Sequence, residues 1–241
     1  MDSSGEVVPT IERVPTGVDG LDSMLEGGFL KRRHVLISGG PGTGKTTFGY
    51  QYLYMGAETH NERGLFVSLE QSANRVVEGA KALFNTWNWD KHLNENIIVT
   101  RIRREDFANI GAIIEGYVNQ HNVKRIVLDS TTLLRLYFRT EDSYRNNLYE
   151  LLDYLGGLNC TAILLSEKSY TKRGEAQFDI EEFITDGVIN LYMVPKKNNR
   201  LRVLEIIKMR DTNHSTNLSP FTITPEGILV SPTTGLFTQV E

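Results

Sequence analysis

The sequence is poor in cysteine, in long apolar runs and in net charge. Its one cysteine, Cys160, excludes a disulfide within the chain, and its apolar surroundings favour a small buried thiol. No apolar run reaches the roughly 18 residues that a membrane span needs, and residues 1–6 show neither a basic nor an apolar signal region, so we expect a cytoplasmic protein with no membrane partner. The net charge of -4 argues against a strong overall attraction to nucleic acid.

The chain also lacks linkers, repeats and low-complexity segments, so we predict a single domain over residues 1–241, with a flexible segment at residues 1–13. Strand-like runs occur at residues 35–38, 65–69, 97–100, 125–128 and 161–165, and helical spacing at residues 46–56, 72–84, 107–121 and 144–156. This alternation predicts an α/β fold whose mostly parallel sheet is covered by helices on both faces. Later runs at residues 186–193, 201–208, 221–224 and 227–230 follow one another through short turns and predict an antiparallel extension.

Residues 39–46 read GGPGTGKT, a complete G-x-x-x-x-G-K-T phosphate loop between an apolar strand and a helix. Glycines at these positions let backbone N–H groups surround phosphate oxygens, Lys45 reaches the β and γ phosphates, and the Thr46 hydroxyl ligates Mg²⁺. The sequence therefore predicts a nucleoside triphosphate site with Mg²⁺. The residues expected to contact the nucleotide are Gly40, Pro41, Gly42, Thr43, Gly44, Lys45, Thr46 and Thr47.

Polar residues that follow other strands supply candidates for the rest of the site. Asp129 follows an apolar run, so it should emerge at the carboxyl edge of the sheet and hold Mg²⁺ together with Thr46. Glu70 follows the run at residues 65–69 and is the candidate base that orients or deprotonates the attacking water, the alternative being a solvated loop glutamate. Ser166 would end the run at residues 161–165 and contact the γ-phosphate, although a simple strand-end serine is the competing interpretation.

Two cations near the end of the chain, Lys208 and Arg210, are two residues apart on a predicted strand and should project from the same face as Leu204 and Ile206. At their own phosphates they would duplicate Lys45. Presented to a neighbouring subunit, they would stabilise transition-state charge, an effect worth ~10³ to 10⁵ in rate. Two solvated cations at a strand end remain the alternative.

From about residue 15 to residue 232 the chain resembles the KaiC domain family of RecA-type ATPases. The resemblance implies a RecA-like core that binds ATP and forms rings, usually homo-hexamers, with ATP between adjacent subunits. It also implies that Lys208 and Arg210 reach a neighbour's nucleotide and that His214 lies near the same interface. The matching segments are TGVDGLD from Thr16 with Gly27-Gly28, the phosphate loop, VSLEQ from Val67, VLDS from Val127, EEFITD from Glu181, KMRDTNH from Lys208 and PFTIT from Pro220.

The chain departs from that family at two places. Members commonly carry paired glutamates where this chain has Glu70 and Gln71, so we expect slow hydrolysis. Glu181 and Glu182 stand at the positions that match the phosphate-accepting Ser-Thr pair of the cyanobacterial clock protein, which excludes autophosphorylation there. Together with the presence of one such domain, this favours a stand-alone archaeal or bacterial version over a circadian oscillator.

Three functions stay open at the level of sequence. The first is an ATP-hydrolysing ring that regulates a protein partner. The second is a single-stranded DNA-binding accessory resembling RadA paralogues, whose candidate loops combine cations with aromatic residues. The third is a non-hydrolysing ATP-sensing scaffold, for which Gln71 is the only hint. The candidate DNA loops span residues 133–145, with Arg135, Tyr137, Phe138, Arg139, Tyr144 and Arg145, and residues 167–178, with Lys168, Tyr170, Lys172, Arg173 and Phe178.

Overall fold

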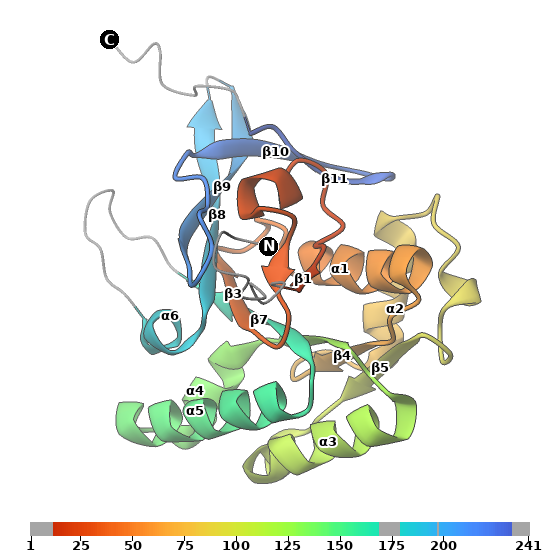
Figure 1. Ribbon diagram of the computed structural model, residues 1–241, viewed down its shortest axis with the longest axis vertical. Helices are drawn as coiled ribbons and strands as arrows, with labels where there is room; N and C mark the ends of the chain where they lie inside the picture. Colours follow the sequence, from red (N-terminus) through yellow and green to blue (C-terminus); the bar gives the residue numbers. More distant parts are fainter. Residues whose placement is uncertain (1–11, 169–178, 197, 233–241) are drawn as a thin grey trace, which may run out of the picture.

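The computed structural model describes residues 12–168, 179–196 and 198–232, which form a twisted sheet with helices on both faces (Figure 1). Its main strands are β3 (His34–Gly39), β4 (Gly64–Ser68), β5 (Ile97–Arg101), β6 (Arg125–Asp129), β7 (Thr161–Glu167), β8 (Gly187–Lys196), β9 (Asn199–Met209), β10 (Ser219–Thr224) and β11 (Gly227–Val230). They lie in the order β11-β10-β9-β8-β3-β7-β6-β4-β5. The short strands β1 (Arg13–Val14) and β2 (Phe29–Leu30) form a separate antiparallel pair.

The helices are α1 (Lys45–His60), α2 (Ala73–Leu83), α3 (Ile110–His121), α4 (Thr131–Phe138), α5 (Glu141–Gly157) and α6 (Ile180–Ile184), with 3-10 turns at Asp22–Leu25, Trp89–Lys91 and Arg104–Asn109. Local sequence sets several of their ends. Thr140 caps α5 by accepting a hydrogen bond from the Ser143 amide at 3.3 Å. Asn61 and Asn122 end α1 and α3 in the left-handed conformation that asparagine tolerates.

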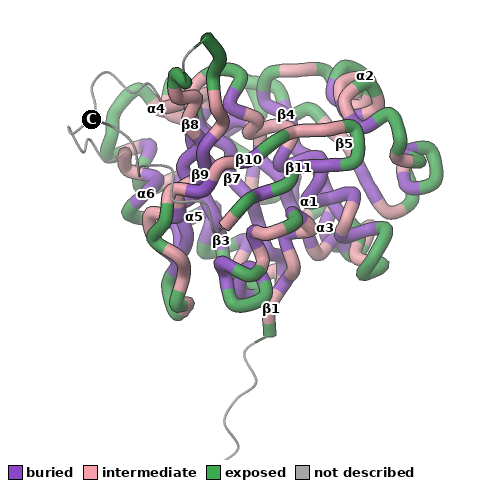
Figure 2. The backbone as a smooth tube through the Cα atoms, turned by 90° about the horizontal axis from the view of Figure 1, so that it is seen from above, coloured by how far each residue is buried: buried purple, intermediate pink, exposed green. Residues whose placement is uncertain are grey.

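The core has two layers because successive residues of the central strands face opposite sides of the sheet. Ile37, Val127 and Ile163 join the cluster beneath α1 and α2. Leu36 and Leu164 join the cluster beneath α3, α4 and α5. The central strands are therefore buried along both faces (Figure 2). Cys160 is also buried, as expected, and no described helix has the length and apolar character of a membrane span.

The α/β fold with a mostly parallel, helix-covered sheet is confirmed, but one strand of the expected antiparallel extension belongs to the parallel part. β8 pairs antiparallel with β9, as the turn near residue 198 indicates, and its other edge pairs parallel with β3, with Val35 opposite Gly187. The reason is that the chain returns to the amino edge of the sheet between β7 and β8. The short turn that follows β8 indicates its antiparallel pairing with β9, but it does not indicate that the chain reaches β8 by crossing back to the amino edge.

The expectation that residues 133–145 form a loop is wrong, because this segment contains α4 and the start of α5; DNA binding by this segment stays a prediction. Tyr144 is 1% exposed, and the Tyr137 ring packs edge-on against Phe107 and Phe138. Arg135 donates to Asp179 at 3.0 Å and to Glu141 at 3.1 Å. These side chains serve the packing of α4 and α5. The second candidate loop, apart from residues 167 and 168, lies outside the described residues.

Candidate functional site

The phosphate loop joins the carboxyl end of β3 to the start of α1, so the unpaired N–H groups of the helix's first turn face the loop. Gly42 and Gly44 have φ angles of 74° and 108°, which only glycine adopts without strain. A Cβ on Gly44 would lie 2.9 Å from the Ile223 Cδ1 atom, so a larger residue there would also displace the tip of this β10 side chain. Pro41 is exposed and Thr43 is buried, with its hydroxyl donating to the Gly40 carbonyl at 2.8 Å. The loop thus has the shape of a backbone cradle for phosphate.

Lys45 lies folded against this loop. Its Nζ donates to the carbonyls of Gly39 at 2.8 Å and of Gly40 at 3.0 Å. Burial lowers the pKa of the ammonium group, while the nearby carboxylates of Glu167, Asp129 and Glu70 oppose that shift. The lysine is therefore a partly desolvated cation held where the phosphates would lie.

Thr46 and Asp129 meet at the carboxyl edge of the sheet, where β6 ends. The Thr46 hydroxyl donates to Asp129 Oδ2 at 2.9 Å. Burial raises the pKa of Asp129 to about 6, the Thr46 hydrogen bond opposes the shift, and Glu70 adds to it. A hydroxyl beside a carboxylate fits Mg²⁺, which keeps waters and phosphate oxygens as its other ligands. The absence, among the described residues, of any cluster of three or more metal-binding side chains is compatible with such a site.

Two further carboxylates approach this edge. Glu70 is exposed and lies two positions beyond β4, and the adjacent Leu69 amide donates to the Asp129 carbonyl at 2.6 Å. Glu167 ends β7 directly opposite Gly39. The apolar run stops at Leu165 and predicts a loop from residue 167, but β7 continues through Ser166 and Glu167. No local signal marks Glu167 as a strand residue, because Ser166 and Glu167 are both polar.

Ser166 does not end its strand as predicted. It is 6% exposed, lies within β7 and pairs in register with Ser38 of β3. Because Ser38 directly precedes Gly39, the first residue of the phosphate loop, Ser166 lies one residue closer to the amino edge of the sheet than that loop. Thr47 is half-buried in the first turn of α1. Contacts of either residue with a nucleotide stay predictions.

Lys208 and Arg210 lie far from their own phosphate loop. The Arg210 amide donates to the Asp186 carbonyl at 3.0 Å, and the Asp186 amide donates to the His34 carbonyl at 2.9 Å, so Arg210 lies level with the beginning of β3. From His34 to Gly39 the strand rises about 16 Å at ~3.3 Å per residue. The two cations therefore lie at the amino edge of the sheet, and the phosphate loop lies at the carboxyl edge.

The predicted orientation of Lys208 is wrong because β9 contains a bulge. Val188 pairs with Lys208 and Ile189 with Ile206, which leaves Ile207 as an extra residue. Lys208 consequently shares the face of its partner Val188, which packs in the α3–α5 cluster, whereas Leu204, Ile206 and Met209 pack in the α1–α2 cluster. Arg210 lies beyond the end of β9.

Asp186 brings the cations of this edge together. Its Oδ1 lies 3.4 Å from Nη1 of Arg210 and 3.4 Å from Nη1 of Arg33. Burial and the Arg210 charge lower the pKa of Lys208, against the opposing charge of Asp186 and Glu182. Arg210 remains 51% exposed. His214 lies in the turn after β9, with Nδ1 3.1 Å from the Ser215 carbonyl.

Three kinds of comparison agree on the relatives of this chain. The pattern of the ATPase family described as KaiC matches residues 14–235. A UPF0273 protein of Thermotoga maritima is 33% identical over 93% of this chain and 98% of its own length. The circadian clock oscillator protein KaiC of Nostoc is 30% identical over 92% of this chain, which spans only 44% of that protein. The crystal structure of a KaiC-like protein from Pyrococcus horikoshii superposes with a TM-score of 0.82, at 38% identity, over 92% of this chain and all of the other.

Proposed function

Because this chain belongs to the KaiC family of ATPases, we propose that it binds and slowly hydrolyses Mg-ATP in a homomeric ring, a hexamer by family resemblance, with each nucleotide held between two subunits. The nucleotide state of the ring would regulate a protein partner. One observation carries the proposal beyond family membership. The phosphate loop lies at one edge of the sheet and the Lys208/Arg210 pair at the opposite edge, so only another copy can bring the two together.

Within one subunit, each residue of the site is assigned the role that its chemistry suits. Lys45 and the amides of residues 40–47 would bind the β and γ phosphates, and Thr46 with Asp129 would hold Mg²⁺. Glu70 would orient or deprotonate the attacking water. Gln71 follows it with an amide in place of a second carboxylate and donates its backbone N–H to the Ser68 hydroxyl at 2.9 Å. A single carboxylate at this position supports slow turnover.

The neighbouring subunit would complete the site with charge. Arg210 is half exposed and its guanidinium is held by Asp186, which fixes its direction without covering it. Lys208 lies beside it, and His214 follows on the same turn. Cations that approach the γ-phosphate from outside stabilise the charge that develops during transfer.

Mixing two inactive variants tests this arrangement. Glu70→Gln should bind nucleotide but lose the base and turn over about 10²- to 10⁴-fold more slowly, and Arg210→Ala should bind nucleotide yet turn over about 10³-fold more slowly. In mixed rings, about one quarter of the interfaces pair an intact Glu70 with an intact arginine from a filled subunit, so phosphate release should return. Failure of the mixture to regain activity, in rings shown by light scattering to contain both variants, would refute the shared site.

The same measurements separate the remaining functions. For a ring enzyme, turnover per subunit should rise with protein concentration as rings assemble. Ring assembly with ATP but without phosphate release would instead identify a sensing scaffold. Of the candidate DNA-contacting residues, Arg135, Tyr137 and Tyr144 are engaged within the fold, whereas Arg139 and Arg145 are exposed. Fluorescence anisotropy with single-stranded oligonucleotide at low and physiological salt tests that alternative directly.

A further inference from the structure

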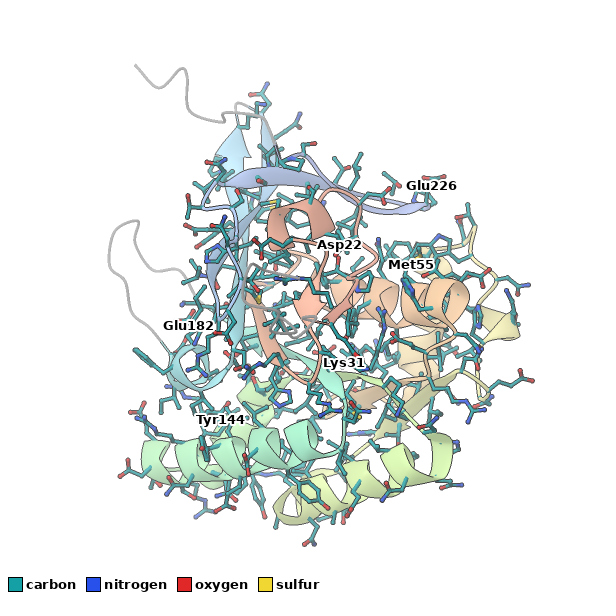
Figure 3. The ribbon with its side chains drawn as sticks, in the orientation of Figure 1. Asp22, Lys31, Met55, Tyr144, Glu182 and Glu226 are labelled. Carbon is teal, nitrogen blue, oxygen red and sulfur yellow. The ribbon has the colours of Figure 1, made fainter. Side chains whose placement is uncertain are left out.

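Helix α6 carries two adjacent glutamates with little exposure to water, Glu181 at 1% and Glu182 at 4%. Burying a carboxylate is costly unless it is paired, so each needs a partner. Glu181 accepts a hydrogen bond from the Tyr144 hydroxyl of α5 at 2.7 Å. Glu182 has a different partner, Lys168, whose Nζ lies 2.6 Å from Oε1. Figure 3 shows Glu182 and Tyr144 on the same side of the molecule.

The Lys168 partner leads directly to the phosphate loop. The Lys168 backbone N–H donates to the Gly39 carbonyl at 3.1 Å, and this carbonyl also accepts from Lys45 Nζ at 2.8 Å. The Lys168 side chain is only 12% exposed in its pair with Glu182. A single carbonyl at the start of the phosphate loop therefore contacts both the phosphate-binding lysine and the residue that anchors α6.

The other end of α6 leads to the cation that we assign to the neighbouring site. The Phe183 carbonyl accepts a hydrogen bond from Arg210 Nη2 at 3.2 Å. Two residues beyond the helix, Asp186 binds Arg210 Nη1. The Glu182 charge also acts on Lys208, whose lowered pKa it opposes. The helix is five residues long and its first turn is fixed by a capping box between Asp179 and Glu182, so the two ends are rigidly connected.

We propose that Lys168 and Glu182 are positioning residues that couple the occupancy of a subunit's own phosphate loop to the position of Arg210 in the next subunit's site. This inference rests on the shared site proposed above. When Lys45 turns from Gly39 to a phosphate, the Gly39 carbonyl loses one of its two donors, and the Lys168 N–H is the donor that remains. The loss of the Lys45 donor shifts Lys168, the Lys168–Glu182 ion pair transmits the shift to α6, and α6 moves Arg210. Sites around the ring then turn over cooperatively.

Rings doped with empty subunits test the coupling. Lys45→Ala subunits keep Arg210 but bind no nucleotide. In the wild-type background we expect total phosphate release to fall more steeply than in proportion to the fraction of intact subunits, because each Lys45→Ala subunit loses its own site and its misplaced Arg210 also slows the neighbouring site. In the Glu182→Gln background an empty subunit's Arg210 should serve as well as a filled one's, so the decline should be proportional. The Hill coefficient for the dependence of turnover on ATP concentration should exceed unity in wild-type rings and fall to about unity in Glu182→Gln rings.

Matched variants separate coupling from folding. Glu181→Gln changes the adjacent buried carboxylate on the same helix without touching the phosphate loop, and should keep the wild-type doping curve. The double variant Lys168→Met/Glu182→Gln leaves no unpaired buried charge and should behave like Glu182→Gln. Nucleotide affinity, followed with a fluorescent ATP analogue, and ring mass should be unchanged in all of them.

Two results would overturn the coupling and leave the shared site intact. One is a proportional decline in wild-type rings. The other is a steep decline that persists in the Glu182→Gln background. Failure of the shared site would show itself differently, as wild-type turnover that is absent or independent of both protein concentration and Arg210.

Discussion

The two edges of the central sheet differ in how their charges are arranged. At the carboxyl edge one cation, Lys45, is surrounded by the carboxylates of Asp129, Glu70 and Glu167. At the opposite edge, where β8 begins and β9 ends, Asp186 lies between Arg33 and Arg210, and Arg33 also pairs with Asp211. The carboxyl edge is therefore acidic around its phosphate loop, whereas at the other edge cations and carboxylates are paired and Arg210 stays half exposed.

Each edge also contains an ionisable group whose charged form is disfavoured within the isolated chain. The pKa of Asp129 is raised by burial, and the pKa of Lys208 is lowered by burial and by Arg210. A metal ion beside Asp129 and a triphosphate beside Lys208 would each favour the charged form. In the shared site proposed above, the acidic edge of one subunit would meet Lys208 and Arg210 of the next. Variants at Glu70, Asp129 and Tyr144 test the carboxyl edge, the cost of keeping it charged, and the helix that joins the edges.

The largest effect is expected at Glu70. Replacing a general base commonly lowers the rate by about 10² to 10⁴. Glu70→Gln should therefore reduce phosphate release by that factor while leaving nucleotide affinity within about twofold, because the residue is exposed and lies beyond the phosphate contacts. Single-turnover phosphate release measures the change. Glu78→Gln, an exposed glutamate on α2, is the control, and equal rates for both variants would transfer the role of base to a residue such as Glu167.

A smaller effect, on stability, is expected at Asp129. Its folded-state pKa of about 6 exceeds the ordinary value of 3.8, so between these pH values the folded protein retains a proton that the unfolded chain has released. Stability from this group falls as pH rises through that window, to a constant cost of about 3 kcal/mol above it. Asp129→Asn removes the cost and can still accept the Thr46 hydrogen bond. The variant should be more stable than the wild type at pH 7 by up to ~3 kcal/mol, and should lose Mg²⁺-dependent nucleotide binding.

Urea unfolding without nucleotide at acidic and neutral pH checks the Asp129 prediction. Asp106→Asn, at an exposed position in the 3-10 turn Arg104–Asn109, should change neither stability nor its pH dependence. A destabilised Asp129→Asn protein at pH 7 would show that the carboxylate is stabilised by its surroundings, and would break the contrast drawn between the two edges.

The parts of the site that local sequence determines could be predicted. The phosphate loop is eight consecutive residues between a strand and a helix, and Asp129 follows a buried apolar run, so the parallel sheet itself brings them to one edge. The same pattern placed most strands to within a few residues, because burial on both faces leaves a continuous apolar signal.

The parts of the site that depend on strand pairing and tertiary contacts could not be predicted from the sequence. One extra residue, Ile207, reverses the face on which Lys208 lies, and no local signal marks that bulge. α4 is short and is stabilised by packing on α5 and β7 rather than by strong propensity, so its cations and aromatics resembled a loop. Glu182 is charged in the sequence like any surface glutamate, and only the fold brings Lys168 to it.

The smallest of the three effects is expected at Tyr144, which holds the helix that joins the two edges. Tyr144→Phe removes the hydroxyl that donates to Glu181 Oε1 and leaves a buried carboxylate whose other oxygen has no hydrogen-bond partner among the described residues. An unsatisfied buried acceptor costs roughly 1–3 kcal/mol, which denaturant unfolding resolves. Tyr149→Phe, on the same helix but 62% exposed, should cost almost nothing. Because Tyr144 binds Glu181 and not Glu182, the rings that stay folded should keep their cooperativity. If Tyr144→Phe lowered both stability and cooperativity, a disturbance at either glutamate would be sufficient to displace α6.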